Sequence, residues 1–123
     1  MARILIVDDE PLIAMLAEDW LDELGHAAVG PAHDLDGALA LAEDDLDAAI
    51  LDLTLGGRES YPVAARLREL GVPFAFATGH GREFLKPDFQ DALQLQKPFE
   101  FETFRSVVDA LTAQAGAKGP GPD

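Results

Sequence analysis

Three aspartates of this sequence follow directly on apolar runs, in positions where a carboxylate can take part in chemistry. Asp52 follows the run 48–51, and Asp8 and Asp9 follow the run 4–7. Short apolar runs of this kind are typical of strands buried on both faces. An ionised carboxylate inside such a strand requires a compensating partner. We therefore expect these aspartates at the carboxyl ends of two strands, although each could instead only cap the turn or helix that follows it.

Two further polar residues stand in matching positions, because Thr78 ends the apolar run 72–78 and Lys97 follows the run 93–96. Taken singly, a threonine in a turn and a solvated lysine at a strand end are ordinary features. A suitable residue at the end of each of four predicted strands is harder to obtain by chance. If the four strands are parallel, their carboxyl ends meet at one edge of a sheet, and the polar residues form one site.

These residue types together indicate phosphoryl transfer. Neighbouring carboxylates repel one another and raise a pKa unless a cation intervenes, and Mg²⁺ prefers oxygen ligands, including a backbone carbonyl near Thr54. Asp52 would be the nucleophile and would form an aspartyl phosphate. Mg²⁺ and Lys97 would neutralise charge on the phosphoryl oxygens, and the Thr78 hydroxyl would donate to one of them.

Hydrophobic periodicity predicts an alternation of strands and helices that can hold such a site. The predicted strands are 3–7, 26–30, 48–53, 72–78 and 93–96, and the predicted helices are 11–24, 35–42, 61–70 and one that follows Pro98. Residues 82–91 favour only a short helix, because Pro87 interrupts them.

This pattern is typical of an α/β, doubly wound, five-stranded parallel sheet with the strand order 2-1-3-4-5. Ligands of such sheets bind at the switch point between the first and third strands, beyond their carboxyl ends. We expect one domain at residues 1–114 and a flexible tail, rich in Gly and Pro, at residues 115–123.

The composition of the chain disfavours several classes of binding partner and a position within a membrane. The chain has 123 residues and a net charge of −14, which disfavours nucleic acid and anionic membranes as partners. It has no cysteine, and no apolar run approaches the roughly 20 residues of a membrane span. The first strand begins within three residues and leaves no room for a signal peptide. We therefore expect a cytoplasmic protein.

Four segments of the sequence, in order, resemble the signatures of the receiver domain of two-component response regulators. They are Val7-Asp8-Asp9-Glu10-Pro11, Ile50-Leu51-Asp52-Leu53, Ala77-Thr78-Gly79 and Gln96-Lys97-Pro98-Phe99. The resemblance extends from residue 2 to about residue 113 and implies the flavodoxin-like receiver fold.

The resemblance also implies a role for each matching residue. Asp9 would bind Mg²⁺ directly, Asp8 would act mostly through water, and Thr54 would offer its backbone carbonyl. Asp52 would be the phosphoacceptor. Thr78 and Lys97 would contact the phosphoryl group, and the Lys97–Pro98 peptide would be cis.

The sequence departs from the typical receiver at three points. Leu55-Gly56-Gly57 replaces the usual Met-Pro and following Gly after the phosphoacceptor. Gln94 stands where receivers carry a Tyr or Phe that rotates on phosphorylation, so the usual switch cannot operate. Residues 73–80 resemble the Pro-Phe-x-Phe-Ala-Thr-Gly-Tyr motif of the alphaproteobacterial FAT GUY subfamily, with His80 in place of its Tyr. Gln94 and His80 are therefore candidate switch residues, although an ordinary loop histidine also explains His80.

We interpret the chain as a stand-alone receiver. It would accept a phosphoryl group from a histidine kinase, by resemblance one of the HWE or a related type, and signal by altered protein binding or by transfer to a phosphotransfer protein. It would catalyse only its own phosphorylation and dephosphorylation, as a monomer or weak dimer. Residues 79–91 would respond to phosphorylation. The family resemblance suggests the first helix and the loop after Lys97 as the partner surface, with Leu12, Met15, Phe99 and Phe101 as candidate contacts or core residues.

Two alternatives remain open at this point. One is a pseudo-receiver that signals by binding alone, which the altered loop and switch positions favour. The other is a phosphatase of the haloacid-dehalogenase type, which also uses an aspartate nucleophile after a strand. That chemistry requires an acid/base aspartate two residues after the nucleophile, where Thr54 stands.

Overall fold

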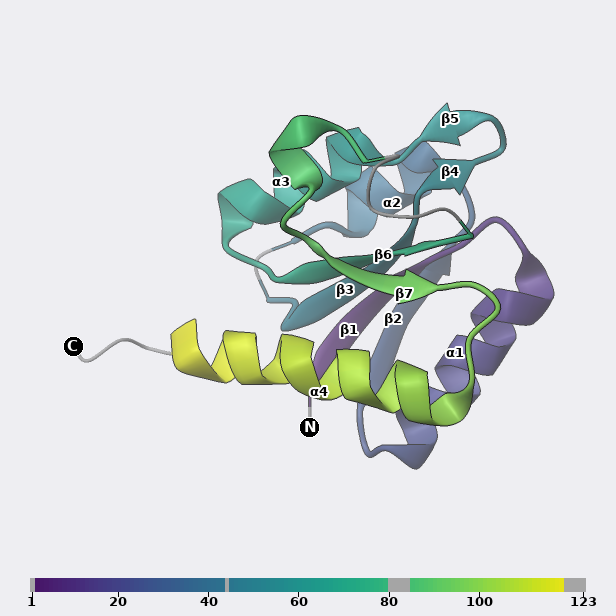
Figure 1. The fold of residues 1–123 in the computed structure, drawn as a ribbon, viewed down its shortest axis with the longest axis vertical. Helices are drawn as coiled ribbons and strands as arrows, with labels where there is room; N and C mark the ends of the chain where they lie inside the picture. Colours follow the sequence, from purple (N-terminus) through teal and green to yellow (C-terminus); the bar gives the residue numbers. More distant parts are fainter. Residues whose placement is uncertain (1, 44, 80–84, 119–123) are drawn as a thin grey trace.

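The computed structural model describes residues 2–43, 45–79 and 85–118 and contains one parallel five-stranded sheet, in the order β2-β1-β3-β6-β7 (Figure 1). The strands are β1 (Arg3–Val7), β2 (Ala27–Ala32), β3 (Ala48–Asp52), β6 (Phe74–Thr78) and β7 (Leu93–Gln96). Each neighbouring pair of these strands is parallel. Counted within the sheet, the order is 2-1-3-4-5, and the predicted doubly wound fold is confirmed.

Helices cover both faces of the sheet, as alternating β and α elements require. They are α1 (Pro11–Glu23), α2 (Leu35–Leu41), α3 (Tyr61–Leu70) and α4 (Phe101–Lys118). Figure 1 shows α1 and α4 on one face and α2 and α3 on the other. Ile4 and Ile6 of β1 belong to the core cluster under α1 and α4, whereas Leu5 and Val7 belong to the cluster under α2 and α3. Both faces of β1 are therefore buried, which explains its continuous apolar sequence. None of the described helices has the length and the apolar character needed to cross a bilayer.

Strand β2 is longer than predicted and continues past Gly30 to Ala32. The Gly30–Pro31 peptide is cis, and the pairing with β1 shifts register between Leu5 and Val7. Gly30 has a φ of 93°, and a Cβ atom there would lie 2.8 Å from the backbone nitrogen of Ala32. A glycine is therefore required at this irregularity.

Helix α4 continues to Lys118, beyond the predicted domain boundary at residue 114. The expectation of a flexible tail from residue 115 was wrong for residues 115–118, because Ala115 and Ala117 favour the helix and the first helix-breaking proline comes at residue 120. Residues 119–123 lie outside the described residues. In the region of the predicted short helix, the structure describes a 3₁₀ turn at Pro87–Phe89.

A short hairpin follows Asp52, in a segment where no strand was predicted from the sequence. Its strands β4 (Thr54–Leu55) and β5 (Arg58–Glu59) pair antiparallel. Gly56 and Gly57 form the turn with φ values of 55° and 87°. Positive φ at both central residues is the geometry of a type I′ turn, which suits the twist of a hairpin and which glycine adopts without strain. The hairpin lies beside the carboxyl edge of the sheet (Figure 1).

Candidate functional site

The carboxyl ends of the central strands bring together the polar residues that the sequence placed there. Asp8 follows β1, Asp52 ends β3 and Thr78 ends β6, with exposed fractions of 4%, 9% and 5%. Lys97 follows β7, and its backbone N–H donates to the Thr78 carbonyl over 2.9 Å. The prediction that these positions share one edge of a parallel sheet therefore holds for the fold.

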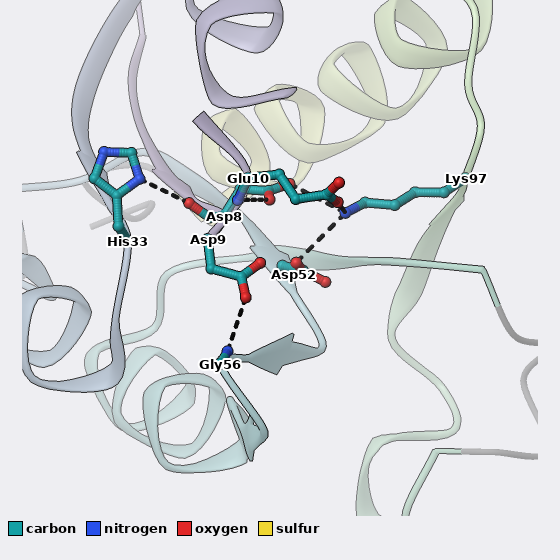
Figure 2. Close-up of polar contacts among 7 residues, drawn as sticks. All are labelled: Asp8, Asp9, Glu10, His33, Asp52, Gly56 and Lys97. Atoms are coloured by element: carbon teal, nitrogen blue, oxygen red, sulfur yellow. Dashed lines mark hydrogen bonds and ion pairs between the residues drawn. The ribbon is translucent and has the colours of Figure 1, made fainter. Parts of the chain in front are cut away.

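Lys97 lies at the centre of an acidic cluster (Figure 2). Its Nζ atom is 3.2 Å from Asp8 Oδ2, 3.4 Å from Asp52 Oδ2 and 3.4 Å from Glu10 Oε1. Burial disfavours the charged ammonium, but the negative charges of Asp52 and Asp8 outweigh this effect and raise the pKa of Lys97. The lysine is therefore a fixed positive charge beside the Asp52 carboxylate at neutral pH.

Burial raises the pKa of Asp52 from its ordinary 3.8 to about 7, with further increases from the Asp8 charge and a hydrogen bond with Asp9. The Lys97 charge opposes these effects and only partly offsets them. Asp52 is therefore partly protonated near neutral pH when no cation is bound. A bound cation would favour the ionised, nucleophilic form.

The carboxylates are arranged so that a cation could bind among them. One oxygen from each of Asp8, Asp9, Glu10 and Asp52 lies within 4.8 Å of the others. A donor set made only of oxygen atoms, with two buried carboxylates in it, fits a hard divalent cation such as Mg²⁺. The resemblance to receiver domains likewise implies Mg²⁺ at such an acidic pocket.

Backbone contacts fix the two aspartates that follow β1 (Figure 2). Asp8 Oδ1 accepts a 2.9 Å hydrogen bond from the Glu10 amide, and Asp9 Oδ2 accepts one of 2.8 Å from the Gly56 amide. The Asp8 carbonyl lies 2.9 Å from His33 Nδ1, which must carry the hydrogen because a carbonyl can only accept. These contacts hold the loop after β1 between β2 and the β4–β5 hairpin.

Glu10, His33 and Gly56 also belong to this site, although they were not predicted from the sequence. Glu10 could have been found, because it directly follows the acidic pair and precedes the proline that begins α1. His33 and Gly56 reach the site from loops after β2 and β3, and no local pattern in the sequence marks them. Their contribution depends on the tertiary fold alone.

The other predicted residues that the structure describes do not belong to this cluster. Thr54 is exposed on β4, and Gln94 lies on β7 in register with Phe76. Leu12 and Met15 are exposed on α1, by 78% and 56%. Among the candidate partner contacts, Phe99 and Phe101 instead pack edge-on against Trp20, at centroid distances of 5.9 and 5.5 Å. His80 lies outside the described residues.

Comparison with known proteins agrees with this geometry. A family model for the response regulator receiver domain matches residues 4–109. The phyllosphere-induced regulator PhyR of Methylorubrum extorquens is 32% identical over 122 residues, which cover 94% of this chain and 46% of PhyR. The chain spans about half the length of the curated relatives it matches first.

Solved structures give a similar result over a nearly full-length match. SdrG from Sphingomonas melonis Fr1 is 45% identical with a TM-score of 0.79, and the match covers 90% of this chain and 96% of SdrG. The BeF₃-activated conformation of SdrG from Pseudomonas melonis Fr1 is 46% identical with a TM-score of 0.76, and the match covers 89% and 95% of the two chains. The chain belongs to the response regulator receiver domain family, whose members are signalling proteins.

Proposed function

We propose that this chain is a phosphoacceptor of a two-component system, which receives a phosphoryl group on Asp52 from a histidine kinase in the presence of Mg²⁺. The observation that carries the proposal is the position of Asp52. Its Oδ2 lies 3.4 Å from the Lys97 ammonium, and its carboxylate belongs to an oxygen cluster suited to a cation. A nucleophile, a fixed positive charge and a candidate metal site thus coincide.

The transfer is a substitution at phosphorus. An Asp52 oxygen forms a bond to the phosphorus atom, the bond from phosphorus to the donor imidazole nitrogen breaks, and that nitrogen keeps the electron pair and takes up a proton from solvent. Lys97 neutralises charge on the phosphoryl oxygens, and the Thr78 hydroxyl donates to one of them. Hydrolysis removes the modification: a water oxygen bonds to phosphorus, the bond between phosphorus and the Asp52 oxygen breaks, and inorganic phosphate and the Asp52 carboxylate are released.

The residues around Asp52 would bind the cation and position Lys97. Asp9 would bind the cation directly, Asp8 mostly through water, and Asp52 and the Thr54 carbonyl would complete the protein ligands. Bound Mg²⁺ supplies positive charge that lowers the repulsion between the Asp52 carboxylate and the incoming phosphoryl group. Asp8 also pairs with Lys97 and so keeps the ammonium beside Asp52.

We propose that the output is a change in protein binding, or onward transfer to a phosphotransfer protein. The protein would catalyse only its own phosphorylation and dephosphorylation, in the cytoplasm. Leu12 and Met15 are exposed on α1, and Leu12 stands two residues after Glu10 of the acidic cluster. A kinase helix that brings its phosphohistidine to Asp52 could therefore bury them. A kinase of the HWE type is the donor that the FAT GUY resemblance indicates.

Intact-mass analysis after incubation with acetyl phosphate tests the proposal. We expect one phosphoryl adduct in the presence of Mg²⁺, and none with EDTA or in Asp52→Asn. Asp19→Asn, which changes an exposed aspartate of α1 outside the cluster, should be modified like the wild type. If acetyl phosphate and a phosphorylated HWE kinase both fail to modify a folded, Mg²⁺-loaded protein, the proposal is wrong and a receiver that acts by binding alone is favoured.

A further inference from the structure

Gln94 has an unusual position in the sheet. Leu93 and Leu95 of β7 pack in the core cluster under α1 and α4. Gln94 therefore points to the opposite face, where it lies in register with Phe76 of β6. Phe76 is fully buried on that face, in the cluster under α2 and α3. The side chain of Gln94 therefore lies on an apolar face of the sheet.

The Nε2 group of Gln94 is buried and has no hydrogen-bond partner among the described residues. A buried amide nitrogen without an acceptor loses its hydrogen bonds to water and gains none in return, which disfavours the conformation that contains it. Such groups are rare in folded proteins and call for a physical explanation. One explanation is that the protein has a second state in which Nε2 finds an acceptor.

The Thr78 hydroxyl is the acceptor that the register places within reach. Thr78 lies two residues after Phe76 on β6, so its side chain is on the same face as Phe76 and Gln94. Diagonal neighbours of this kind lie about 7–8 Å apart, a separation that a long side chain can span. Thr78 is itself buried and ends the strand beside Asp52.

We propose that Gln94 is a positioning residue for Thr78 in the phosphorylated protein. Nε2 of Gln94 donates to Oγ1 of Thr78, and the Thr78 hydroxyl then directs its single hydrogen to a phosphoryl oxygen on Asp52. This inference rests on the proposed function. A hydroxyl that donates to an anion becomes a better acceptor, so the two hydrogen bonds strengthen each other.

This relay differs from a rotating aromatic side chain, because the glutamine acts through a hydrogen bond. It also accounts for the buried amide: the unsatisfied Nε2 disfavours the unphosphorylated state and is satisfied only after phosphorylation. The relay would therefore shift the equilibrium toward the phosphorylated conformation. A hydrophobic side chain of similar length at position 94 would remove both the unsatisfied amide of the unphosphorylated state and the hydrogen bond to Thr78 in the phosphorylated state.

Binding of BeF₃⁻, a phosphoryl mimic, in the presence of Mg²⁺ tests the inference by calorimetry. Gln94→Met keeps the length of the side chain and removes the donor, and we expect it to weaken BeF₃⁻ binding by about five- to tenfold, the size of one net hydrogen bond. Gln96→Met is the matched control, because Gln96 is an exposed glutamine on the same strand and face. It should bind like the wild type.

A double-mutant cycle separates the relay from a general packing effect. In a Thr78→Val background, Gln94→Met should cause no further loss, whereas in a Thr78→Ser background, which keeps a hydroxyl, it should still weaken binding. Unliganded Gln94→Met should be no less stable than the wild type, because the orphaned amide is gone.

Two results would overturn the inference while the proposed function stands: unchanged BeF₃⁻ affinity in Gln94→Met, or an equal loss in the Thr78→Val background. Wild-type protein that does not bind BeF₃⁻ with Mg²⁺ would overturn the proposed function, and this inference with it.

Discussion

The Gly56 amide donates a 2.8 Å hydrogen bond to Asp9 Oδ2, although 47 residues separate the two in sequence. This bond ties the acidic loop after β1 to the β4–β5 hairpin. Gly56 and Gly57 can both adopt the positive φ that the turn requires, and so they aim the amide at Asp9. The unusual Gly-Gly pair after the phosphoacceptor thus orients a proposed metal ligand.

A change in the turn should therefore weaken Mg²⁺ binding. Gly57→Val places a β-branched side chain at a φ of 87°, which should open the turn and withdraw the Gly56 amide from Asp9. We expect the Mg²⁺ dissociation constant, measured by calorimetry, to rise about three- to tenfold, the range for one net hydrogen bond. Gly57→Asn tolerates positive φ and should bind like the wild type. Equal affinity in all three proteins would show that the hairpin does not orient Asp9.

Removal of the Lys97 ammonium should separate metal binding from phosphorylation. Lys97→Met takes away the positive charge that lies within 3.4 Å of three carboxylates. Mg²⁺ affinity should stay the same or increase, because the competing cation is lost, while the yield of phosphoryl adduct should fall at least about tenfold, as expected when one charge-stabilising group is removed. Lys86→Met is the control, since Lys86 lies over the Tyr61 ring and outside the acidic cluster. A phosphorylation yield equal to that of the wild type would contradict the proposed role of Lys97.

The sequence was sufficient to predict the five strands of the sheet and the sheet edge at which the site residues meet. Apolar runs bounded by Gly and Pro mark buried parallel strands, and parallel strands present their carboxyl ends together, so Asp8, Asp52 and Thr78 had to be neighbours. Helix α3 was predicted with its observed ends, because Gly71 adopts the left-handed conformation that terminates it.

The hairpin and the supporting contacts could not be predicted in the same way. Strands of two residues are too short to produce an alternating pattern, and Gly56-Gly57 alone indicates only a turn. The contacts of His33 with Asp8 and of Gly56 with Asp9 join loops that are distant in sequence. They follow from the order of strands in the sheet, which local patterns do not encode residue by residue.

The raised pKa of Asp52 predicts a pH dependence of stability. Its folded-state pKa of about 7 exceeds its ordinary 3.8, so between these values the folded protein binds more protons than the unfolded chain. The free energy of unfolding should therefore fall as pH rises from about 4 to about 7, and Asp52→Asn should abolish this contribution. In EDTA, the free energy of unfolding of Asp52→Asn should exceed that of the wild type by an amount that grows as pH rises. The difference should reach on the order of a few kcal/mol at pH 8.

Urea unfolding at several pH values measures this difference, and Mg²⁺ provides an internal check. At pH 8 the cation should stabilise the wild type more than Asp52→Asn, because it removes the repulsion among the carboxylates. A stability difference that does not change between pH 5 and pH 8 would mean that the Asp52 pKa is not raised in the folded protein.

Two adjacent residues at the start of α3 offer a matched test of hydrogen bonding. The Tyr61 hydroxyl accepts a 2.9 Å hydrogen bond from the Lys86 amide, whereas the buried Ser60 Oγ has no partner among the described residues. Tyr61→Phe should lower the free energy of unfolding by about 1 kcal/mol, and Ser60→Ala should not lower it. Chemical denaturation of both variants decides the point, and a larger loss in Ser60→Ala than in Tyr61→Phe would contradict the assignment.

Residues 85–92 are held against α3, and their protection should report on phosphorylation. The Arg68 guanidinium donates to the Asp88 carbonyl over 2.8 Å and lies 4.6 Å from the Phe89 ring centroid. Tyr61 packs on the same ring, and Phe89 in turn contacts Phe76, two residues before Thr78 on β6. The segment is therefore connected through packed side chains to the strand that ends beside Asp52.

Addition of BeF₃⁻ and Mg²⁺ should slow amide hydrogen exchange in this segment by at least about threefold, because ordering at Thr78 reduces local opening of its neighbours. Arg68→Met should raise exchange of the segment in the free protein, since it removes the hydrogen bond to the Asp88 carbonyl. Arg66→Met, which changes an exposed arginine of the same helix paired only with Glu69 among the described residues, should leave exchange there unchanged. Equal protection of 85–92 with and without the mimic would mean that the response to phosphorylation lies elsewhere in the protein.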